Sequence, residues 1–139
     1  MSEHLVTLFP DDVGPKIPAE LFGHLLETTG RCAYDGVWVG EDSPIPNDDG
    51  LRLDVIEAYR QLRASNVRLG GAAGEYYHWQ EGIGPRGQRR RSRNVFWGGY
   101  DSNHFGTDEF LGWCEAIGAE PILQVNVATG SRREALDWM

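Results

Sequence analysis

The chain has 139 residues, enough for one domain of modest size with its own hydrophobic core. Hydrophobic residues make up 40% of it and charged residues 24%, which is ordinary for a globular protein in water. The formal net charge of −8 disfavours nucleic acid and anionic membranes as partners and is compatible with a neutral ligand such as a sugar.

Cysteine usage and the first residues of the chain indicate a reducing compartment. The two cysteines, Cys32 and Cys114, are far apart and match neither a disulfide framework nor a zinc site. The N-terminus has no basic region followed by a long apolar one, and no stretch approaches the ~20 apolar residues of a membrane span. We therefore expect a cytoplasmic protein that holds no metal and no cofactor.

The first half of the chain predicts two strands and a helix. Residues 5–9 form a short apolar run that a Pro-Asp-Asp turn ends, which is typical of a strand. A second apolar run, residues 21–26, ends at Glu27, and an irregular glycine- and proline-rich loop follows over residues 30–50. A helix is predicted over residues 54–63, beginning near residues 51–54, because apolar side chains recur at spacings of three and four: Leu53, Ile56, Tyr59 and Leu62.

The second half predicts two more strands, each followed or preceded by a helix. Residues 66–69 form a brief strand that leads into Gly70-Gly71, and a long loop rich in glycine and aromatic residues runs from 72 to 104. A helix over residues 107–117 places Phe110, Leu111, Cys114 and Ile117 on one face, and Gly118 closes it. A strand over residues 120–126 precedes a helix over residues 131–138, with Ser131 as its N-cap.

The alternation of strands and helices favours parallel strands with crossover helices, an α/β fold. A (β/α)8 barrel needs ~250 residues and eight such units, whereas this chain has about three, so we expect part of a larger domain. Periodicity alone does not distinguish a barrel from an open doubly wound sheet. In either case Glu27, Gly70-Gly71 and Asn126 follow strands, where barrel enzymes place binding groups.

Short motifs occur along the chain in an order that characterises one enzyme family. Together they span roughly residues 17–138, and the chain on this basis resembles the N-terminal part of the retaining α-L-arabinofuranosidases of glycoside hydrolase family 51. The motifs are residues 21–27 (LFGHLLE) with Gly30-Arg31, residues 34–40 (YDGVWVG), residues 45–47 with 50–52, Arg68 with Gly70-Gly71, residues 77–79 with 82–86, residues 103–110 (NHFGTDEF), and residues 120–121 with 125–126, 129–130 and 134–135.

The resemblance implies a TIM barrel that carries the active site, together with a β-sandwich. We expect residues 15–139 to form the N-terminal part of the barrel, truncated, and the strand in residues 1–14 to join the β-sandwich that C-terminal sequence would complete. The implied reaction releases terminal non-reducing α-L-arabinofuranosyl residues from oligo- and polysaccharides with retained configuration, in L-arabinose metabolism. The parent enzyme is then expected to form homo-oligomers.

The resemblance also distributes the chemistry between this chain and the rest of the parent. Its nucleophile and acid/base are two glutamates held about 5 Å apart, at the ends of later strands. We expect no catalytic residue within residues 1–139, and the chain alone to be inactive.

Three residues are candidates for substrate binding on this resemblance. Glu27 matches a sugar-binding glutamate at the end of the first barrel strand, where a carboxylate can accept charge-assisted hydrogen bonds from hydroxyls. Trp97 is a candidate for packing against the furanose, and Asn126 faces the same region. The alternatives are a solvated charge, a loop aromatic that caps the barrel and a structural asparagine, respectively. Asn103 and Glu109 are expected to hold the loop to the helix start.

Departures from the family pattern support a second hypothesis. The family motif Arg-x-Pro-Gly-Gly, followed by a polar residue, is one residue short here, lacks the proline and has Ala72 in the polar position. Thr28 stands where a histidine often follows the sugar-binding glutamate. The chain could therefore come from a degenerate, non-catalytic relative that binds sugar or has a structural role, and a third hypothesis is another α/β barrel that shares only the scaffold.

Other signals are weaker. The basic run Arg89-Arg90-Arg91 with Arg93 suggests a nucleic-acid patch, but it matches an arginine-rich loop of the family and the chain is otherwise acidic. The four histidines have no metal-ligand spacing, and neither a phosphate-binding loop nor a serine-hydrolase motif is present.

Overall fold

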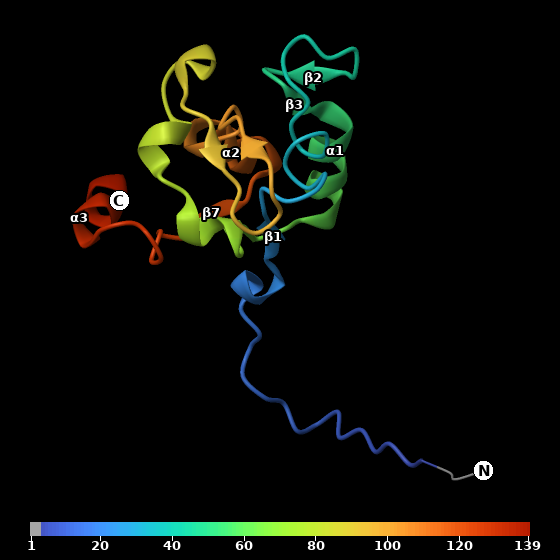
Figure 1. Ribbon diagram of the computed structural model, residues 1–139. Coiled ribbons are helices and arrows are strands. Elements are labelled where there is room, and N and C mark those ends of the chain that lie inside the picture. Colours follow the sequence, from blue (N-terminus) through green and yellow to red (C-terminus); the bar gives the residue numbers. More distant parts are fainter. Residues whose placement is uncertain (1–3) are drawn as a thin grey trace.

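The computed structural model describes residues 4–139, and its centre is a three-stranded parallel sheet (Figure 1). The strands lie in the order β1 (His24–Leu26), β4 (Asn66–Leu69) and β7 (Glu120–Leu123). The register pairs Leu26 with Leu69 and Leu69 with Leu123, so the carboxyl ends of the strands are level. The other elements are β2 (Asn47–Asp48), β3 (Leu51–Arg52), β5 (Ser92–Arg93), β6 (Tyr100–Asp101), α1 (Leu53–Leu62), α2 (Thr107–Ile117), α3 (Arg132–Trp138) and four 3-10 helices, η1 (Ala19–Phe22), η2 (Ala73–Tyr76), η3 (Trp79–Gly82) and η4 (Arg86–Gln88).

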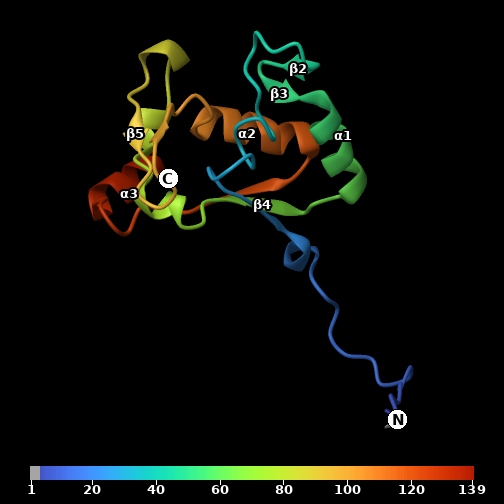
Figure 2. The same cartoon turned by 45° about the vertical axis from the view of Figure 1, so that its right-hand side comes forward.

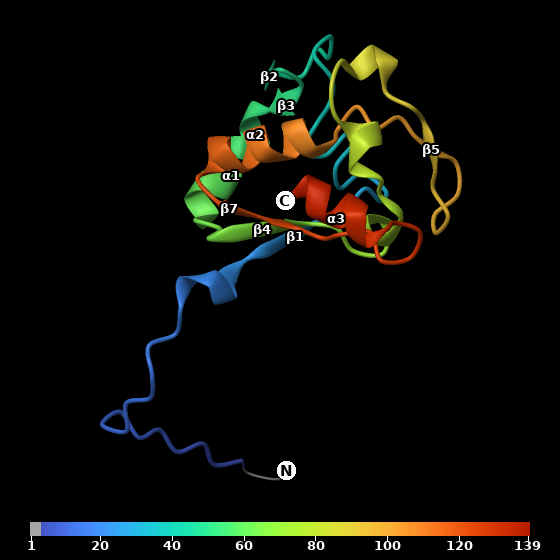
Figure 3. The same cartoon turned by 90° about the vertical axis from the view of Figure 1, so that its left-hand side faces the viewer.

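Helices α1 and α2 cover the same face of the sheet, as Figures 2 and 3 show. Helix α1 ends where Arg63 adopts a left-handed conformation, and α2 ends at Gly118 in the same conformation, with φ of 53° and 73° respectively. The predicted helices over residues 54–63 and 107–117 and the predicted strand over residues 66–69 are confirmed. Parallel pairing of the three strands is confirmed as well.

The core lies between this face and the two helices. Its largest fully buried side chains are Trp113, Phe105, Phe110, Val67 and Cys114. Burial, with a contribution from the charge of Glu120, raises the pKa of the Cys114 thiol to about 12, so the thiol is an inert core group. The prediction that Leu111 lies on the buried face of α2 was wrong, since Leu111 is 40% exposed. The buried face includes Trp113 instead, because its ring packs edge-on against Tyr59 of α1.

The opposite face of the sheet is uncovered. Side chains alternate along a strand, so Leu25, Arg68 and Ile122, which are paired in the register, point away from the helices. Leu25 is 45% exposed and Ile122 is 44% exposed. Two exposed apolar side chains on an open sheet face, one on each outer strand, indicate a surface that a larger structure would bury.

Two strand predictions need correction. Residues 5–9 form no strand, because no neighbouring strand accepts their backbone hydrogen bonds, and the segment runs away from the sheet with Leu5 at 92% exposure (Figure 1). Residues 1–3 of the predicted segment 1–14 lie outside the described residues. The strand predicted over residues 120–126 ends at Leu123, because the backbone turns at Asn126, whose side chain caps that turn.

Candidate functional site

The candidate site lies at the carboxyl edge of the sheet, where Glu27, Gly70 and Gln124 directly follow the three aligned strands. The backbone N–H of Gly70 donates to the carbonyl of Leu26 at 3.1 Å and so ties the first two strand ends together. Backbone and side chains from distant parts of the sequence meet here because parallel strands all end at the same edge. Glu27 and Gly70-Gly71 follow strand ends as the sequence indicated, whereas Gln124 rather than Asn126 follows the third strand.

Glu27 is half-buried and only partly engaged. Its Oε1 accepts a hydrogen bond from the backbone N–H of Ala73 at 3.0 Å, and its carboxylate lies directly against the α-carbon of Gly71. Its Oε2 accepts no hydrogen bond from residues 4–139. One oxygen therefore fixes the carboxylate, and the other can accept a hydrogen bond from a ligand hydroxyl.

Gln124 was missed by sequence reasoning. Its side-chain amide pairs with the peptide of Gly71 in both directions, with Nε2 donating to the Gly71 carbonyl and Oε1 accepting from the Gly71 N–H, each at 2.9 Å. The sequence placed Gln124 inside a strand, where its amide would have had no special partner. A predicted strand that ended at Leu123 would have placed Gln124 directly after a strand end and so marked it as a candidate.

Trp97 belongs to the wall of an open cavity beside the loop that follows Glu27 in the sequence. The cavity has a volume of about 460 Å³, and Thr28 and Thr29, which follow Glu27, form part of its lining. Trp97 is 59% exposed and Tyr100 in the same lining is 67% exposed, so both leave aromatic surface open to solvent. The other lining residues are Gly30, Tyr34, Asn94, Gly98, Asp101 and Ser102. An open wall of aromatic rings and hydroxyl groups suits a polar ring-shaped ligand such as a sugar.

Tyr34 is a lining residue of the same cavity and is fixed by hydrogen bonds. Its hydroxyl donates to Oδ1 of Asp101 at 2.6 Å and accepts from the backbone N–H of Phe105 at 3.2 Å. Burial, reinforced by the charge of Asp101, raises the pKa of Tyr34 well above its ordinary value. Tyr34 is therefore a fixed neutral donor that holds the loop in place.

The side chain of Asn126 forms hydrogen bonds within the turn that it begins. Its Oδ1 accepts from the backbone N–H groups of Thr129 and Gly130, each at 2.9 Å, and the residue is 8% exposed. Its Nδ2 donates to Oγ1 of Thr129 at 3.0 Å and lies 3.5 Å from Nε2 of His78. The structure thus places Asn126 in the turn before α3, Glu27 against the turn of Gly71 and Ala73, and Trp97 in the cavity lined by Thr28 and Thr29.

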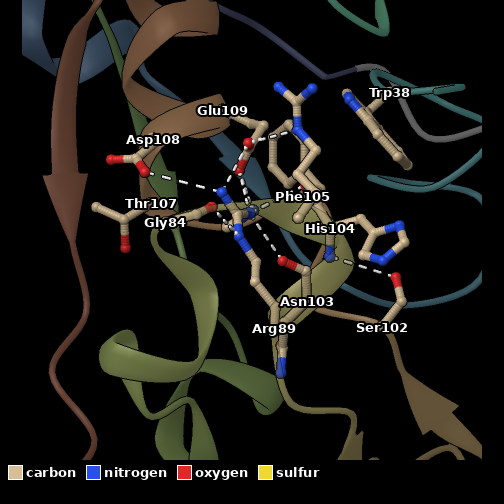
Figure 4. Close-up of polar contacts among 12 residues, drawn as sticks. Trp38, Gly84, Arg89, Ser102, Asn103, His104, Phe105, Thr107, Asp108 and Glu109 are labelled. Carbon is tan, nitrogen blue, oxygen red and sulfur yellow. Dashed lines mark hydrogen bonds and ion pairs between the residues drawn. The ribbon is translucent and has the colours of Figure 1, made fainter. Parts of the chain in front are cut away.

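A buried ion-pair cluster supports the loop that bears Trp97 (Figure 4). Glu109 of α2 accepts from Arg89 at 2.6 Å, from Arg86 at 2.8 Å and from the backbone N–H of Gly106 at 2.8 Å. Burial by itself would raise the pKa of Glu109, but these donors outweigh it and the pKa lies below its ordinary value. The Nδ2 of Asn103 donates to the carbonyl of Arg90 at 2.6 Å. The prediction that Asn103 and Glu109 hold the loop to the helix start is confirmed.

The same cluster explains the basic run. The side chain of Arg89 is 2% exposed and neutralised by Glu109, and Arg90 lies 3.5 Å from a carboxylate oxygen of Glu81. Arg91 lies over the ring of Tyr100 at 5.5 Å. Within this basic run, Arg89 is therefore a buried structural residue, whereas Arg90 lies at the surface.

Two further findings concern residues 4–139 only. They contain no group of three or more histidine, cysteine, aspartate or glutamate side chains arranged to hold a metal ion. Among the same residues, no helix is both long and apolar enough to span a membrane.

Comparison with known proteins gives consistent results. The sequence model of one protein family, the alpha-L-arabinofuranosidase 1 domain, matches residues 58–138 of this chain. The chain is 42% identical over 136 residues to an intracellular exo-alpha-L-arabinofuranosidase of Bacteroides ovatus, covering 96% of this chain and 26% of that protein. It is 40% identical to alpha-L-arabinofuranosidase C of Emericella nidulans, over 96% of this chain and 27% of the relative. The chain thus spans about a quarter of the length of the curated relatives it matches.

A solved structure agrees with these matches. The crystal structure of the family 51 arabinofuranosidase from Xanthomonas axonopodis pv. citri superimposes with a TM-score of 0.89 at 38% identity, covering 93% of this chain and 27% of the other. The superposition therefore covers nearly all of this chain.

Proposed function

Since the chain belongs to the α-L-arabinofuranosidases of glycoside hydrolase family 51, we propose that it supplies part of the sugar-binding site of an enzyme that releases terminal non-reducing α-L-arabinofuranosyl residues. The observation that carries this proposal is the likeness of 93% of this chain to a solved family 51 arabinofuranosidase, with Glu27 directly after β1 at the carboxyl edge of the sheet. The substrates are oligo- and polysaccharides that bear arabinose, used in L-arabinose metabolism.

The uncovered sheet face supports the proposal that the chain forms the first three βα units of a (β/α)8 barrel. In such a barrel the helices lie outside and the other sheet face lines the packed interior. Leu25 and Ile122 would then be buried, and the free edges of β1 and β7 would pair with further strands. The exposed apolar segment 5–9 suits a strand of a separate β-sandwich, for which it would need a partner strand.

Within this enzyme, Glu27 binds sugar hydroxyls and Trp97 packs against the sugar. Asn126 contributes through the shape of its turn, because its amide oxygen is already occupied by Thr129 and Gly130. The reaction proceeds with retention through a glycosyl-enzyme intermediate on two glutamates about 5 Å apart, contributed by later strands of the parent. The chain requires no cofactor for this chemistry.

The cellular setting is part of the same proposal. The parent acts in the cytoplasm as a homo-oligomer, and the word intracellular in the name of the Bacteroides ovatus relative supports the location.

A non-catalytic relative is the second candidate. It is favoured by Ala72 and Ala73, which stand in the turn beside Glu27 and offer no side-chain hydrogen bond to a sugar.

One experiment separates the two. The longer polypeptide that contains residues 1–139 and the 139-residue chain are each assayed with an aryl α-L-arabinofuranoside, and the anomer first released is identified by proton NMR. We expect the longer polypeptide to release α-L-arabinofuranose and the chain alone to release none. A folded longer polypeptide that binds arabinose without turnover would establish the second candidate, and release of the β-anomer would refute retention.

A further inference from the structure

The turn that follows β4 is held between two side chains from the neighbouring strands. Gly70 and Gly71 lie between Gln124, which follows β7, and Glu27, which follows β1. A β-carbon at Gly70 would overlap the Gln124 amide, and one at Gly71 would overlap the Glu27 carboxylate. The turn is therefore in direct contact with a side chain on each side.

Gln124 holds this turn through two hydrogen bonds between its side-chain amide and the backbone of Gly71. Its amide matches both hydrogen-bonding groups of the Gly71 peptide, each at 2.9 Å. At neutral pH, where carboxyl groups are ionised and only accept, the side-chain amide of asparagine or glutamine presents a donor and an acceptor side by side. The same side chain packs next to Gly74, where a β-carbon would lie 3.3 Å from the Gln124 Cδ. The side chain thus fixes the turn by shape and by hydrogen bonding.

The opposite side of the turn determines where Glu27 lies. Gly71 has φ of +86°, a conformation that glycine adopts freely and that leaves its α-carbon bare against the carboxylate. Two residues later, the N–H of Ala73 donates to Oε1 of Glu27. A displacement of the turn would consequently move both the surface against which Glu27 packs and its hydrogen-bond donor.

We infer that Gln124 is a positioning residue that sets the Glu27 carboxylate through the Gly70–Ala73 turn. A flexible glycine pair would not fix a binding carboxylate by itself, and groups at such sites need a rigid supporting shell. The inference rests on the proposed function in one respect, namely that Glu27 binds the substrate.

The test compares Gln124→Met, which keeps the shape but loses both hydrogen bonds, with Gln124→Glu, which keeps the acceptor and loses the donor. Gln61→Met on the exposed side of α1 is the matched control. Each change is made in the longer polypeptide, alone and together with Glu27→Gln, and kcat/KM is measured against pH. Amide hydrogen exchange of Gly71 and Ala73 is measured in the same proteins.

We expect Gln124→Met to lower kcat/KM roughly 5- to 150-fold, which is the fold-change that corresponds to the loss of two neutral hydrogen bonds. This loss should nearly vanish in the Glu27→Gln background, because both changes act on the same group. In Gln124→Glu, activity relative to the unchanged enzyme should rise as the pH falls, since the protonated carboxyl regains a donor for the Gly71 carbonyl. Exchange at Gly71 and Ala73 should accelerate in Gln124→Met and not in Gln61→Met.

Losses that add up in the double variant, or unchanged exchange at Gly71 and Ala73, would overturn the inference. If Glu27→Gln itself leaves kcat/KM unchanged, the proposed role of Glu27 fails and the inference about its positioning fails with it. If instead Glu27→Gln lowers kcat/KM while Gln124→Met does not, the proposed function stands and the inference alone is refuted.

Discussion

Arg89 and Glu109 form a buried ion pair that joins the loop after η4 to the first turn of α2. Their closest atoms, Nη1 and Oε2, are 2.6 Å apart, and the two side chains are 2% and 3% exposed. Arg89 also donates to the carbonyls of Gly84, Asn103 and His104. One guanidinium therefore satisfies backbone groups at both ends of the loop segment that contains Trp97.

Replacing Arg89 with methionine should destabilise the protein by about 3–5 kcal/mol, because the partners of a buried charge lose their donor. The free energy of unfolding from urea titration measures this. Arg90→Met is the control, since its side chain is 83% exposed and its ion pair with Glu81 is long; we expect a change below about 0.5 kcal/mol there. Equal effects of the two substitutions would contradict the structural role of Arg89.

Acidification should reveal the lowered pKa of Glu109. A carboxyl group whose folded pKa lies below its unfolded value contributes stability above the unfolded value of about 4.3, and this contribution is lost as the pH falls through the folded pKa. Stability should therefore decline with falling pH from about pH 5 downward, and less steeply in Glu109→Gln. Urea titrations at several pH values measure the slope, with the exposed Glu57→Gln as control. An unchanged slope in Glu109→Gln would refute this account.

Two glycines of the α2 region should respond in opposite directions to alanine. Gly112 lies inside α2 with free space where a β-carbon would stand, so Gly112→Ala should stabilise the protein by about 0.5–1 kcal/mol. Gly118 caps the helix with φ of +73°, so Gly118→Ala should cost about 1–2 kcal/mol despite equally open space. Thermal unfolding of the pair gives the comparison, and a shift of Tm in the same direction for both would be inconsistent with these backbone conformations.

Glu27→Gln in the longer polypeptide should lower kcat/KM without loss of stability. A charged hydrogen bond contributes about 1.5–3 kcal/mol, which corresponds to a fall of roughly 10- to 150-fold. The core does not include Glu27, so Tm should stay within a degree or two, roughly the range of surface substitutions. Near-unchanged kinetics would remove Glu27 from the site, and a lower Tm would assign it a structural role.

The 139-residue chain expressed alone should associate in solution. Leu25 and Ile122 lie on an open sheet face, the edges of β1 and β7 are unpaired, and residues 5–22 expose large apolar side chains. Light scattering after size-exclusion chromatography should show mass that increases with concentration. Removal of residues 1–18 separates the contribution of the tail from that of the sheet. A monodisperse monomer with a sharp cooperative melt would show the prediction to be wrong.

The sequence by itself determined the elements whose signals are local. The spacing of Ile56 and Tyr59, the stop at Gly118 and the Ser131 cap each depend on residues within one or two turns, and each is found where predicted. The alternation of these elements determined parallel pairing, and the family motifs placed Glu27 at a strand end.

Only the tertiary structure decided the features that depend on residues far apart in the sequence. The pairing of Gln124 with Gly71 joins residues 53 positions apart, and no local pattern in either segment indicates it. Burial of Trp113 rather than Leu111 depends on where Tyr59 of α1 lies. Residues 5–9 have the composition of a strand but form none here. A strand needs a neighbouring strand for its backbone hydrogen bonds, and the composition of a segment does not say whether that neighbour is present.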